Sequence, residues 1–369
     1  VWTGPADGAV REGGAGCAPW QGLLDGKALE IPANTTVNAL IDLGTYQCCY
    51  PLLALAGSAG ATVRLTWMES LFLEPHTRGH APKGQRDAVD GKFIHGVSDT
   101  FRSGGTGRVD LPALWWRAGR FVHVRVTTAA APLRIDGLAF RGTRYPLHED
   151  AAFRCDDGEV SGIWPILVRG LQMSAHETWV DCPYYEQLMY VGDTRTEALT
   201  ALTLSRDDRL SRRCLELFDW SRWATGWVAE RYPSDPFQAS STYALIWPLC
   251  VHDHWQMRGD VAFTRERLIG IRQMLELALA HRREDGRCGV LPGWSFVDWV
   301  PGWKTGMGPG VVEGDSSILD LHLILALQAA ADLEDAVGEA ACAARWRAHA
   351  RRAATATAAR FWNEERGLL

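Results

Sequence analysis

The chain has 369 residues, a length at which two to three domains and a large core are expected. Hydrophobic residues make up 47% and charged residues 22%, which is ordinary globular usage and argues against a disordered or fibrous protein. The net charge is −6, without the excess of positive charge that binding to a polyphosphate backbone requires, so no nucleic-acid partner is expected. No apolar run reaches the roughly 18 residues of a membrane span, so no membrane partner is expected either.

Residues 1–30 are interpreted as a leader or linker, since the glycine-rich run at 13–16 follows no strand pattern. The nine cysteines are an odd number without a C-x-x-C pair, which favours free thiols over a zinc site or a disulfide framework. Free thiols predict a reducing, cytoplasmic compartment. Secretion stays an open alternative, because the chain starts without a methionine and is treated as a fragment.

Residues 31–149 are typical of an antiparallel β domain. Alternating apolar and polar side chains predict strands at 36–41, 61–67 and 120–126. Glycine-rich turns separate these stretches, and their number favours a β-sandwich. The polar, aperiodic stretch 75–106 predicts a long excursion between strands.

From residue 150 onward the pattern becomes helical. The pair Asp156-Asp157 is expected to cap a helix whose apolar stripe is Val160, Ile163, Trp164, Leu167 and Leu171. Thr194 and Glu197 have the spacing of a capping box ahead of the next helix. The remaining pattern predicts about seven helices in all, the later ones near 206–222, 238–258, 261–283, 315–335 and 338–363, with a Gly/Trp-rich loop at 284–314.

Charge and aromatic content differ between the two parts. Residues 1–147 carry 15 basic and 12 acidic side chains, whereas residues 148–369 carry 23 and 32. The acidic surplus suits acid–base chemistry on a neutral substrate, and a solvated acidic face is the ordinary alternative. The chain has 17 tryptophans, which either stack on sugar rings or pack a large helical core.

The segment 181–193 has the highest density of side chains suited to catalysis or sugar binding, with three carboxylates and three tyrosines. Pro183 disfavours a helical residue before it, so Asp181 is expected on a loop that leaves the preceding helix. Such a loop is suited to form the floor of a sugar-binding site. The structural alternative makes Asp181 a turn residue, Glu186 a surface charge and Asp193 a helix cap.

This segment resembles the signature of the bacterial α-L-rhamnosidases of glycoside hydrolase family 78, in which Asp-Cys-Pro precedes a glutamate and an aromatic-x-Gly-Asp. The similarity extends to 177–180, 194–199, 226–234, 294–299 and 114–122. It covers most of residues 35–369 and implies a β-sandwich followed by an (α/α)6-barrel, or toroid. Since only about seven helices are expected over 150–369, the toroid is expected to be incomplete at its C-terminal side.

Carried over residue by residue, the resemblance implies Glu186 as the general acid and Asp181 and Asp193 as rhamnose-binding residues. It implies Tyr190 as the aromatic platform, a position that is often tryptophan in the family. Tyr185 stands where many members have an arginine that can hold sugar hydroxyls. Both tyrosines are expected to alter the sugar contacts without removing the acid.

Asp298 and Trp299 are two further candidates, expected to bind a sugar hydroxyl and to pack against the sugar ring. The alternative places Trp299 in the core, with Asp298 as a cap. No metal ligands and no cofactor are expected, because His252 and His254 are two residues apart on one predicted helix and point to different faces.

The implied reaction is inverting hydrolysis that releases terminal α-L-rhamnose from glycosides or polysaccharides. It requires a general base roughly 6.5–9.5 Å from the acid. In the family this base lies on a later helix–helix loop, so it is expected to be absent from residues 1–369. Glu313, in the loop 306–314, is the alternative base.

Two other functions remain open: a non-catalytic carbohydrate-binding protein, and a polysaccharide lyase on a similar toroid. A lyase acts on uronates and favours a basic cleft, whereas residues 148–369 are acidic. An incomplete toroid would expose a large apolar face, through which the chain is expected to form a homo-oligomer or to be covered by a longer polypeptide.

Overall fold

The computed structural model describes residues 2–3, 16–75 and 81–369. The chain divides into two compact units. The β unit comprises Val1–Arg144 and Pro183–Tyr185, and the helical unit comprises Tyr145–Cys182 and Glu186–Leu369. The first passage from one unit to the other therefore falls between Arg144 and Tyr145, shortly before the boundary predicted from the sequence.

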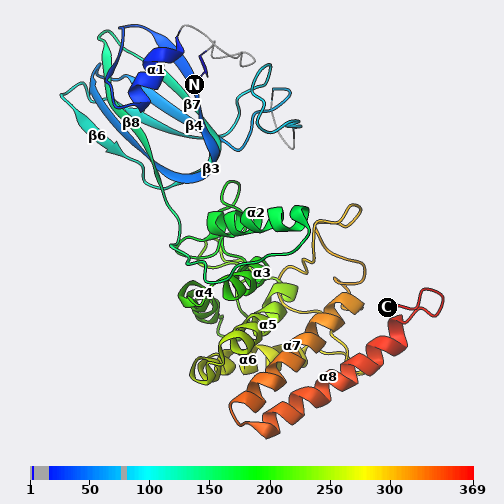
Figure 1. Cartoon of the computed structure of the whole chain (residues 1–369). Helices are drawn as coiled ribbons and strands as arrows, with labels where there is room; N and C mark the ends of the chain where they lie inside the picture. The colour runs from blue at the N-terminus through cyan, green and yellow to red at the C-terminus, as the bar shows by residue number, and fades with distance from the viewer. Residues whose placement is uncertain (1, 4–15, 76–80) are drawn as a thin grey trace. The chain divides into compact units, whose positions relative to one another are not determined.

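The β unit contains one antiparallel sheet of eight strands (Figure 1). Its main path runs β2-β8-β3-β7-β4-β5, and β1 and β6 also pair with β3. All three predicted strands are present: 36–41 and 120–126 lie within the longer strands β3 and β7, and 61–67 is offset by one residue from β4. The strands are β1 (Trp2–Thr3), β2 (Leu29–Ile31), β3 (Thr36–Gly57), β4 (Thr62–Met68), β5 (Val97–Arg102), β6 (Val109–Pro112), β7 (Arg117–Thr127) and β8 (Leu133–Gly142).

Two expectations for the β unit need correction. The stretch 75–106 is not wholly an excursion, because its polar residues 97–102 form β5 on the edge of the sheet. Residues 17–24 of the expected leader form helix α1 (Cys17–Leu24), whose Trp20 and Leu23 are buried in the core of the sheet. Most of the glycine-rich run at 13–16 lies outside the described residues.

Strand β3 holds the sheet together because its two halves pair with different neighbours. Its first half pairs with β7, and its second half pairs with β8 on one side and β6 on the other. Between Asp42 and Gln47 the register shifts, and Gly44 takes a φ of 80° that favours glycine. Arg120 on β7 donates to both carboxylate oxygens of Asp42, at 2.8 and 2.9 Å, and so anchors the irregular segment.

The buried histidine of β7 makes the β unit sensitive to acid. Burial lowers the pKa of His123 to about 4, and the charges of Arg125 and Arg64 act in the same direction. In the unfolded chain this pKa is near 6.5, so the unfolded state takes up a proton at a higher pH than the folded state does. The stability that the neutral His123 allows is therefore complete above pH 6.5 and is lost as the pH falls through 4. We expect the free energy of unfolding of the β unit to fall by about 2–3 kcal/mol over that range through His123.

The check is hydrogen exchange of β7 in urea at several pH values, in the parent and in His123→Gln. Glutamine can keep the 3.1 Å contact to Asn38 but cannot titrate, so the variant should lose this part of the acid sensitivity. His95→Gln, at an exposed position, is the matched control and should leave the pH dependence unchanged. Equal acid sensitivity in parent and His123→Gln would contradict the prediction.

The helical unit contains seven helices in the described residues, as predicted. Helices α3, α5 and α7 pack against one another in turn, and α4, α6 and α8 each pack beside a member of that row (Figure 1). The helices are α2 (Gly158–Ser174), α3 (Val191–Leu204), α4 (Arg209–Trp220), α5 (Ser241–Arg258), α6 (Val261–Ala280), α7 (Ser317–Ala336) and α8 (Ala340–Phe361). The loop between α6 and α7 corresponds to the predicted Gly/Trp-rich loop.

The two predicted caps have different outcomes. Of the predicted pair Asp156-Asp157, it is Asp157 that caps α2, since its carboxylate accepts from the amides of Glu159 and Val160. Thr194 is not a cap, because α3 already begins at Val191 with Tyr190 as its N-cap residue. The Val191 amide donates to the Glu230 carbonyl at 2.9 Å, so a distant segment determines where this helix starts.

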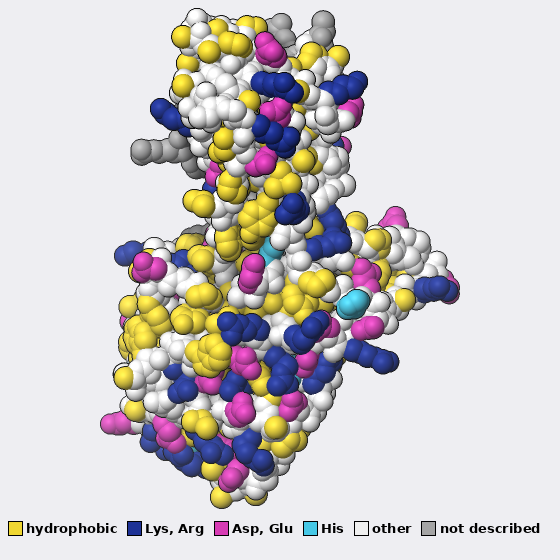
Figure 2. All heavy atoms as spheres, turned by 90° about the vertical axis from the view of Figure 1, so that its left-hand side faces the viewer, with side chains coloured by type: hydrophobic (Ala, Val, Ile, Leu, Met, Phe, Trp, Pro, Cys, Tyr) yellow, Lys and Arg dark blue, Asp and Glu magenta, His cyan; other side chains and the backbone are white. Residues whose placement is uncertain are grey.

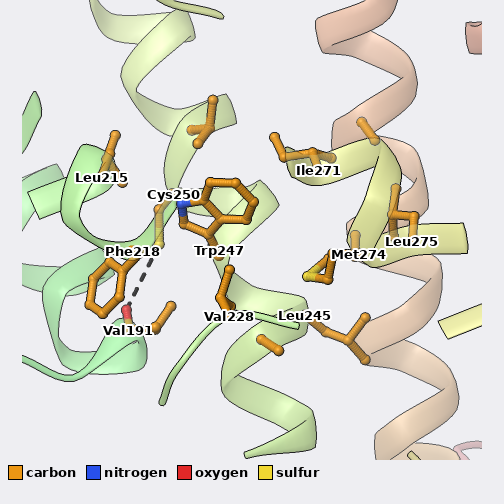
Figure 3. Packing of buried hydrophobic residues seen from close by; sticks show 14 of the residues in the cluster. Val191, Leu215, Phe218, Val228, Leu245, Trp247, Cys250, Ile271, Met274 and Leu275 are labelled. Carbon is orange, nitrogen blue, oxygen red and sulfur yellow. Dashed lines mark hydrogen bonds between the residues drawn. The ribbon is translucent and has the colours of Figure 1, made fainter. Parts of the chain in front are cut away.

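The core of the helical unit is formed by large side chains from several helices (Figure 3). Trp247 on α5 lies among Phe218 of α4 and Ile271 and Met274 of α6, and all four are fully buried. A Cβ on Gly270 would come within 2.9 Å of the Trp247 ring, so the glycine allows α6 to approach the indole. Tryptophan thus serves core packing here, one of the two predicted roles.

The predicted apolar stripe of α2 is only partly buried. Leu171 is 7% exposed, but Val160, Ile163 and Leu167 are 41%, 47% and 57% exposed. Figure 2 shows exposed hydrophobic side chains among charged ones on one face of the molecule. Association through such a face stays a prediction. Among the described helices, none is both long and apolar enough to cross a membrane.

Candidate active site

The candidate site is built on the loop between α2 and α3. This loop closes on itself, because the Asp181 amide donates to the Leu188 carbonyl at 2.9 Å and the Leu188 amide donates to Oδ1 of Asp181 at 3.1 Å. The Gln187 amide donates to the Cys182 carbonyl at 3.0 Å, with Gln187 at a φ of 56°. Glu186 is therefore held in a short closed loop with its side chain exposed.

Glu186 is hydrogen-bonded to Tyr190, the N-cap residue of the next helix. The Tyr190 hydroxyl donates to Oε2 of Glu186 at 2.6 Å, and Nη1 of Arg231 donates to the Tyr190 oxygen at 3.2 Å. The Arg231 guanidinium also lies 5.9 Å from the centre of the Tyr190 ring. Burial and the contact with Glu186 raise the pKa of Tyr190, so its hydroxyl stays protonated and acts as a donor.

The two predicted sugar-binding aspartates lie on either side of this pair in sequence. Burial raises the pKa of Asp181 to about 6, and the nearby charge of Glu186 acts in the same direction. Asp193 lies in the first turn of α3, where the helix favours a carboxylate, yet burial raises its pKa, and the charges of Glu186 and Asp298 add to the effect. The structure thus brings Asp181, Glu186 and Asp193 together, as the sequence predicted.

Ligand atoms of Asp181, Cys182 and Glu186 lie within 4.8 Å of one another, close enough to share a cation. Neighbouring acidic groups often adopt such a spacing without an ion. The same spacing sets the Glu186 carboxylate beside Asp181, where its charge adds to the rise in the pKa of Asp181.

Two buried carboxyl groups near the site were missed by the sequence reasoning. Glu230 is 2% exposed, and burial raises its pKa to about 7, with Asp193 and Glu186 adding to the effect. Glu197, interpreted from sequence as part of a capping box, has a pKa raised to about 9 by burial and by Asp193 and Asp181. The only sequence signal for Glu230 was its place in the family-like stretch 226–234.

Tyr243 on α5 lies close to Asp193. Its pKa is raised mainly by burial and then by the charges of Asp193, Glu230 and Asp298, which places these groups around it. A Cβ on Gly192 would come within 2.9 Å of the Tyr243 ring, so glycine at this position lets α5 approach the start of α3. No sequence pattern indicated Tyr243.

The loop between α6 and α7 supplies Asp298 and Trp299. Trp299 is 70% exposed, so the alternative that made it a core residue is wrong. It belongs to an aromatic cluster in which its ring centre lies 5.3 Å from Phe296 and 5.9 Å from Trp294. Oδ1 of Asp298 accepts from the Trp299 amide at 2.7 Å, which fixes the backbone beneath the indole.

The remaining candidates are Tyr185 and Glu313, whose roles stay predictions. Tyr185 belongs to the β unit, where its hydroxyl accepts from Nζ of Lys83 at 2.7 Å. Glu313 is exposed in the turn that follows Val311, and its use as a base stays a prediction.

The family model for the bacterial alpha-L-rhamnosidase 6 hairpin glycosidase domain matches residues 148–369. The chain belongs to this family. The resemblance inferred from the segment 181–193 is thereby confirmed, and residues 148–369 form a domain of the rhamnosidase six-hairpin type. No curated protein matches the sequence.

Solved rhamnosidase structures share the fold. The family 78 rhamnosidase of Bacillus sp. GL1 is 24% identical with a TM-score of 0.74, over 92% of this chain and 34% of that one. The rhamnosidase from Klebsiella oxytoca, with rhamnose bound, is 21% identical with a TM-score of 0.73, over 98% and 69%. The Streptomyces avermitilis α-L-rhamnosidase, complexed with L-rhamnose, is 17% identical with a TM-score of 0.62, over 93% and 32%. The chain thus spans about a third of the Bacillus protein.

Proposed function

We propose that the chain belongs to an inverting α-L-rhamnosidase that releases terminal α-L-rhamnose from glycosides or polysaccharides. In this proposal the chain supplies the general acid, Glu186. The observation that carries the proposal is the group of Asp181, Glu186 and Asp193 at the start of α3 in a rhamnosidase-family domain. The rhamnose in the Klebsiella and Streptomyces structures supports this sugar as the substrate.

Glu186 has the position that proton donation requires. It is exposed in a closed loop, so a glycosidic oxygen can approach its carboxyl group. In the proposed step, the C–O bond breaks, its electron pair stays with the leaving oxygen, and that oxygen takes the proton from Glu186. Water adds to the anomeric carbon from the opposite face and gives its own proton to a base.

Asp181 and Asp193 are assigned to the sugar hydroxyls, and Tyr190 and Trp299 to the faces of the sugar ring. The aspartates are half-buried and next to the acid, and Trp299 is an exposed indole fixed from below by Asp298. Aromatic faces with a few convergent polar groups are typical of carbohydrate sites. The Asp298 carboxylate already accepts one backbone hydrogen bond and keeps its second oxygen for a hydroxyl.

The general base is predicted to lie outside residues 1–369, with Glu313 as the alternative. Without a positioned base, we expect hydrolysis by this chain to be about 10²- to 10⁴-fold slower than with one. Adding an external nucleophile such as azide should partly restore turnover, because it needs no base to lose a proton. Fast hydrolysis in water that is lost in Glu313→Gln would instead identify Glu313 as the base.

Product analysis tests the function as a whole. With an aryl α-L-rhamnoside as substrate, we expect free rhamnose that is first released as the β anomer in a proton NMR time course. First appearance of the α anomer would contradict inversion. An unsaturated sugar from a uronate polysaccharide would indicate a lyase, and rhamnose binding without turnover after the azide test would indicate a binding protein.

A further inference from the structure

The contact between Tyr190 and Glu186 has a specific consequence for the acid. The 2.6 Å distance is that of a strong O–H···O hydrogen bond, and Tyr190 can only donate in it, because its raised pKa keeps the hydroxyl protonated. A donor stabilises a carboxylate more than a carboxylic acid. The bond therefore favours the form that Glu186 reaches after it has given up its proton.

Arg231 holds this donor in place. The segment of Arg231 runs antiparallel to that of Tyr190, and the Tyr232 amide donates to the Met189 carbonyl at 3.1 Å. Nη1 of Arg231 donates to the Tyr190 oxygen, which leaves the hydroxyl hydrogen free to point at Glu186. Nε of Arg231 is buried and has no hydrogen-bond partner among the described residues.

We propose that Tyr190, held by Arg231, is a positioning residue that stabilises the Glu186 carboxylate as its proton passes to the glycosidic oxygen. This proposal rests on the proposed function and deepens it. Tyr190 thus has a role beyond that of an aromatic platform, and a tryptophan at this position would lack the hydroxyl.

The other titratable groups near Glu186 come from three segments of the helical unit. Asp181 and Cys182 precede it in the same loop, Asp193 lies on α3, and Glu230 lies beside Arg231. The three carboxyl groups place like charges near Glu186, whereas Tyr190 supplies a hydrogen-bond donor and Arg231 a positive charge beside that donor.

Tyr190→Phe tests the proposal, because it keeps the ring and removes the donor. The activity of the parent should fall on the alkaline side as Glu186 loses its proton. In the variant, we expect this fall to move upward by roughly 0.5–1.5 pH units, a 3- to 30-fold change in proton affinity. At the plateau, kcat should decrease about 3- to 10-fold, because a more basic carboxylate is a weaker acid, while KM changes less than about twofold.

Tyr145→Phe is the matched control. The Tyr145 hydroxyl also donates to a carboxylate, Oδ2 of Asp207 at 2.8 Å, but Asp207 lies beyond the far end of α3, about 20 Å from Tyr190. This variant loses a comparable bond without touching Glu186, so its pH profile should match that of the parent. If Tyr190→Phe does not fold, Arg231→Gln gives a second test and should move the profile in the same direction by a smaller amount.

A carboxyl titration separates this proposal from the proposed function. In the full chain labelled with ¹³C-glutamate, the signal that disappears in Glu186→Gln is followed by NMR against pH. An upward shift of its midpoint in Tyr190→Phe supports the positioning role even if no rhamnoside is hydrolysed, in which case only the function fails. An unchanged midpoint overturns the positioning role, whatever the activity.

Discussion

Replacing Glu186 by glutamine is expected to reduce hydrolysis of alkyl rhamnosides by about 10²- to 10⁴-fold. The amide has nearly the shape of the acid and can still accept a hydrogen bond from Tyr190, but it has no proton of suitable acidity for the leaving oxygen. The Glu186 side chain is exposed, and within the described part of the chain its hydrogen bond is the one with Tyr190. The loop should therefore keep its structure in the variant. The measurement is kcat/KM at the optimal pH.

The leaving group shows whether the loss concerns proton donation. The leaving group of a 2,4-dinitrophenyl rhamnoside is 2,4-dinitrophenolate, which is stable without a proton. Glu186→Gln should therefore lose far less activity on this substrate than on an alkyl rhamnoside. Glu177→Gln, an exposed glutamate at the start of the same loop, undergoes the same chemical change and should stay within about twofold of the parent. Full activity of Glu186→Gln on alkyl rhamnosides would remove the assignment of the acid.

Replacing Trp247 by alanine is expected to lower the free energy of unfolding of the helical unit by about 3–5 kcal/mol. The indole is fully buried between α4 and α6, and Gly270 shapes the surface against which it packs (Figure 3). Its N–H has no partner among the described residues, so the loss is one of packing without a hydrogen bond to replace. Urea unfolding followed by circular dichroism at 222 nm measures the change.

Trp220→Ala is the matched control for that substitution. Trp220 ends α4, is 59% exposed and has the Arg213 guanidinium 5.1 Å from its ring, so its removal should cost no more than about 1 kcal/mol. Similar losses for the two tryptophans would show that Trp247 does not have the core position assigned to it. A loss confined to Trp247→Ala supports that position.

Local patterns predicted much of the molecule. The alternation within 36–41, 61–67 and 120–126 was sufficient to find three strands, because a strand exposes every second residue to one face whatever lies beyond it. Asp157 was recognisable as a cap for a similar reason, since the amides it accepts from are two and three residues away. The motif from Asp181 to Asp193 likewise lies in one continuous stretch, so its carboxylates could be predicted to meet.

Only the tertiary structure decided features that depend on distant segments. Helix α3 starts at Val191 and not at Thr194, because the backbone of residues 230–232 pairs with that of 189–191. The burial of Glu230 and its closeness to Glu186 arise from the same pairing. Tyr243 reaches the site through the packing of α5 on α3.

The exposure of helix faces and the order of strands in the sheet also depend on distant segments. The sequence predicts that α2 has an apolar stripe, but whether Ile163 and Leu167 are covered depends on which helices pack against them. The joining of all strands into one sheet depends on β3 pairing with different neighbours along its length. Periodicity and capping involve residues within about four positions of each other, whereas burial, pKa and strand order involve contacts across tens of residues, and only the folded chain determines these.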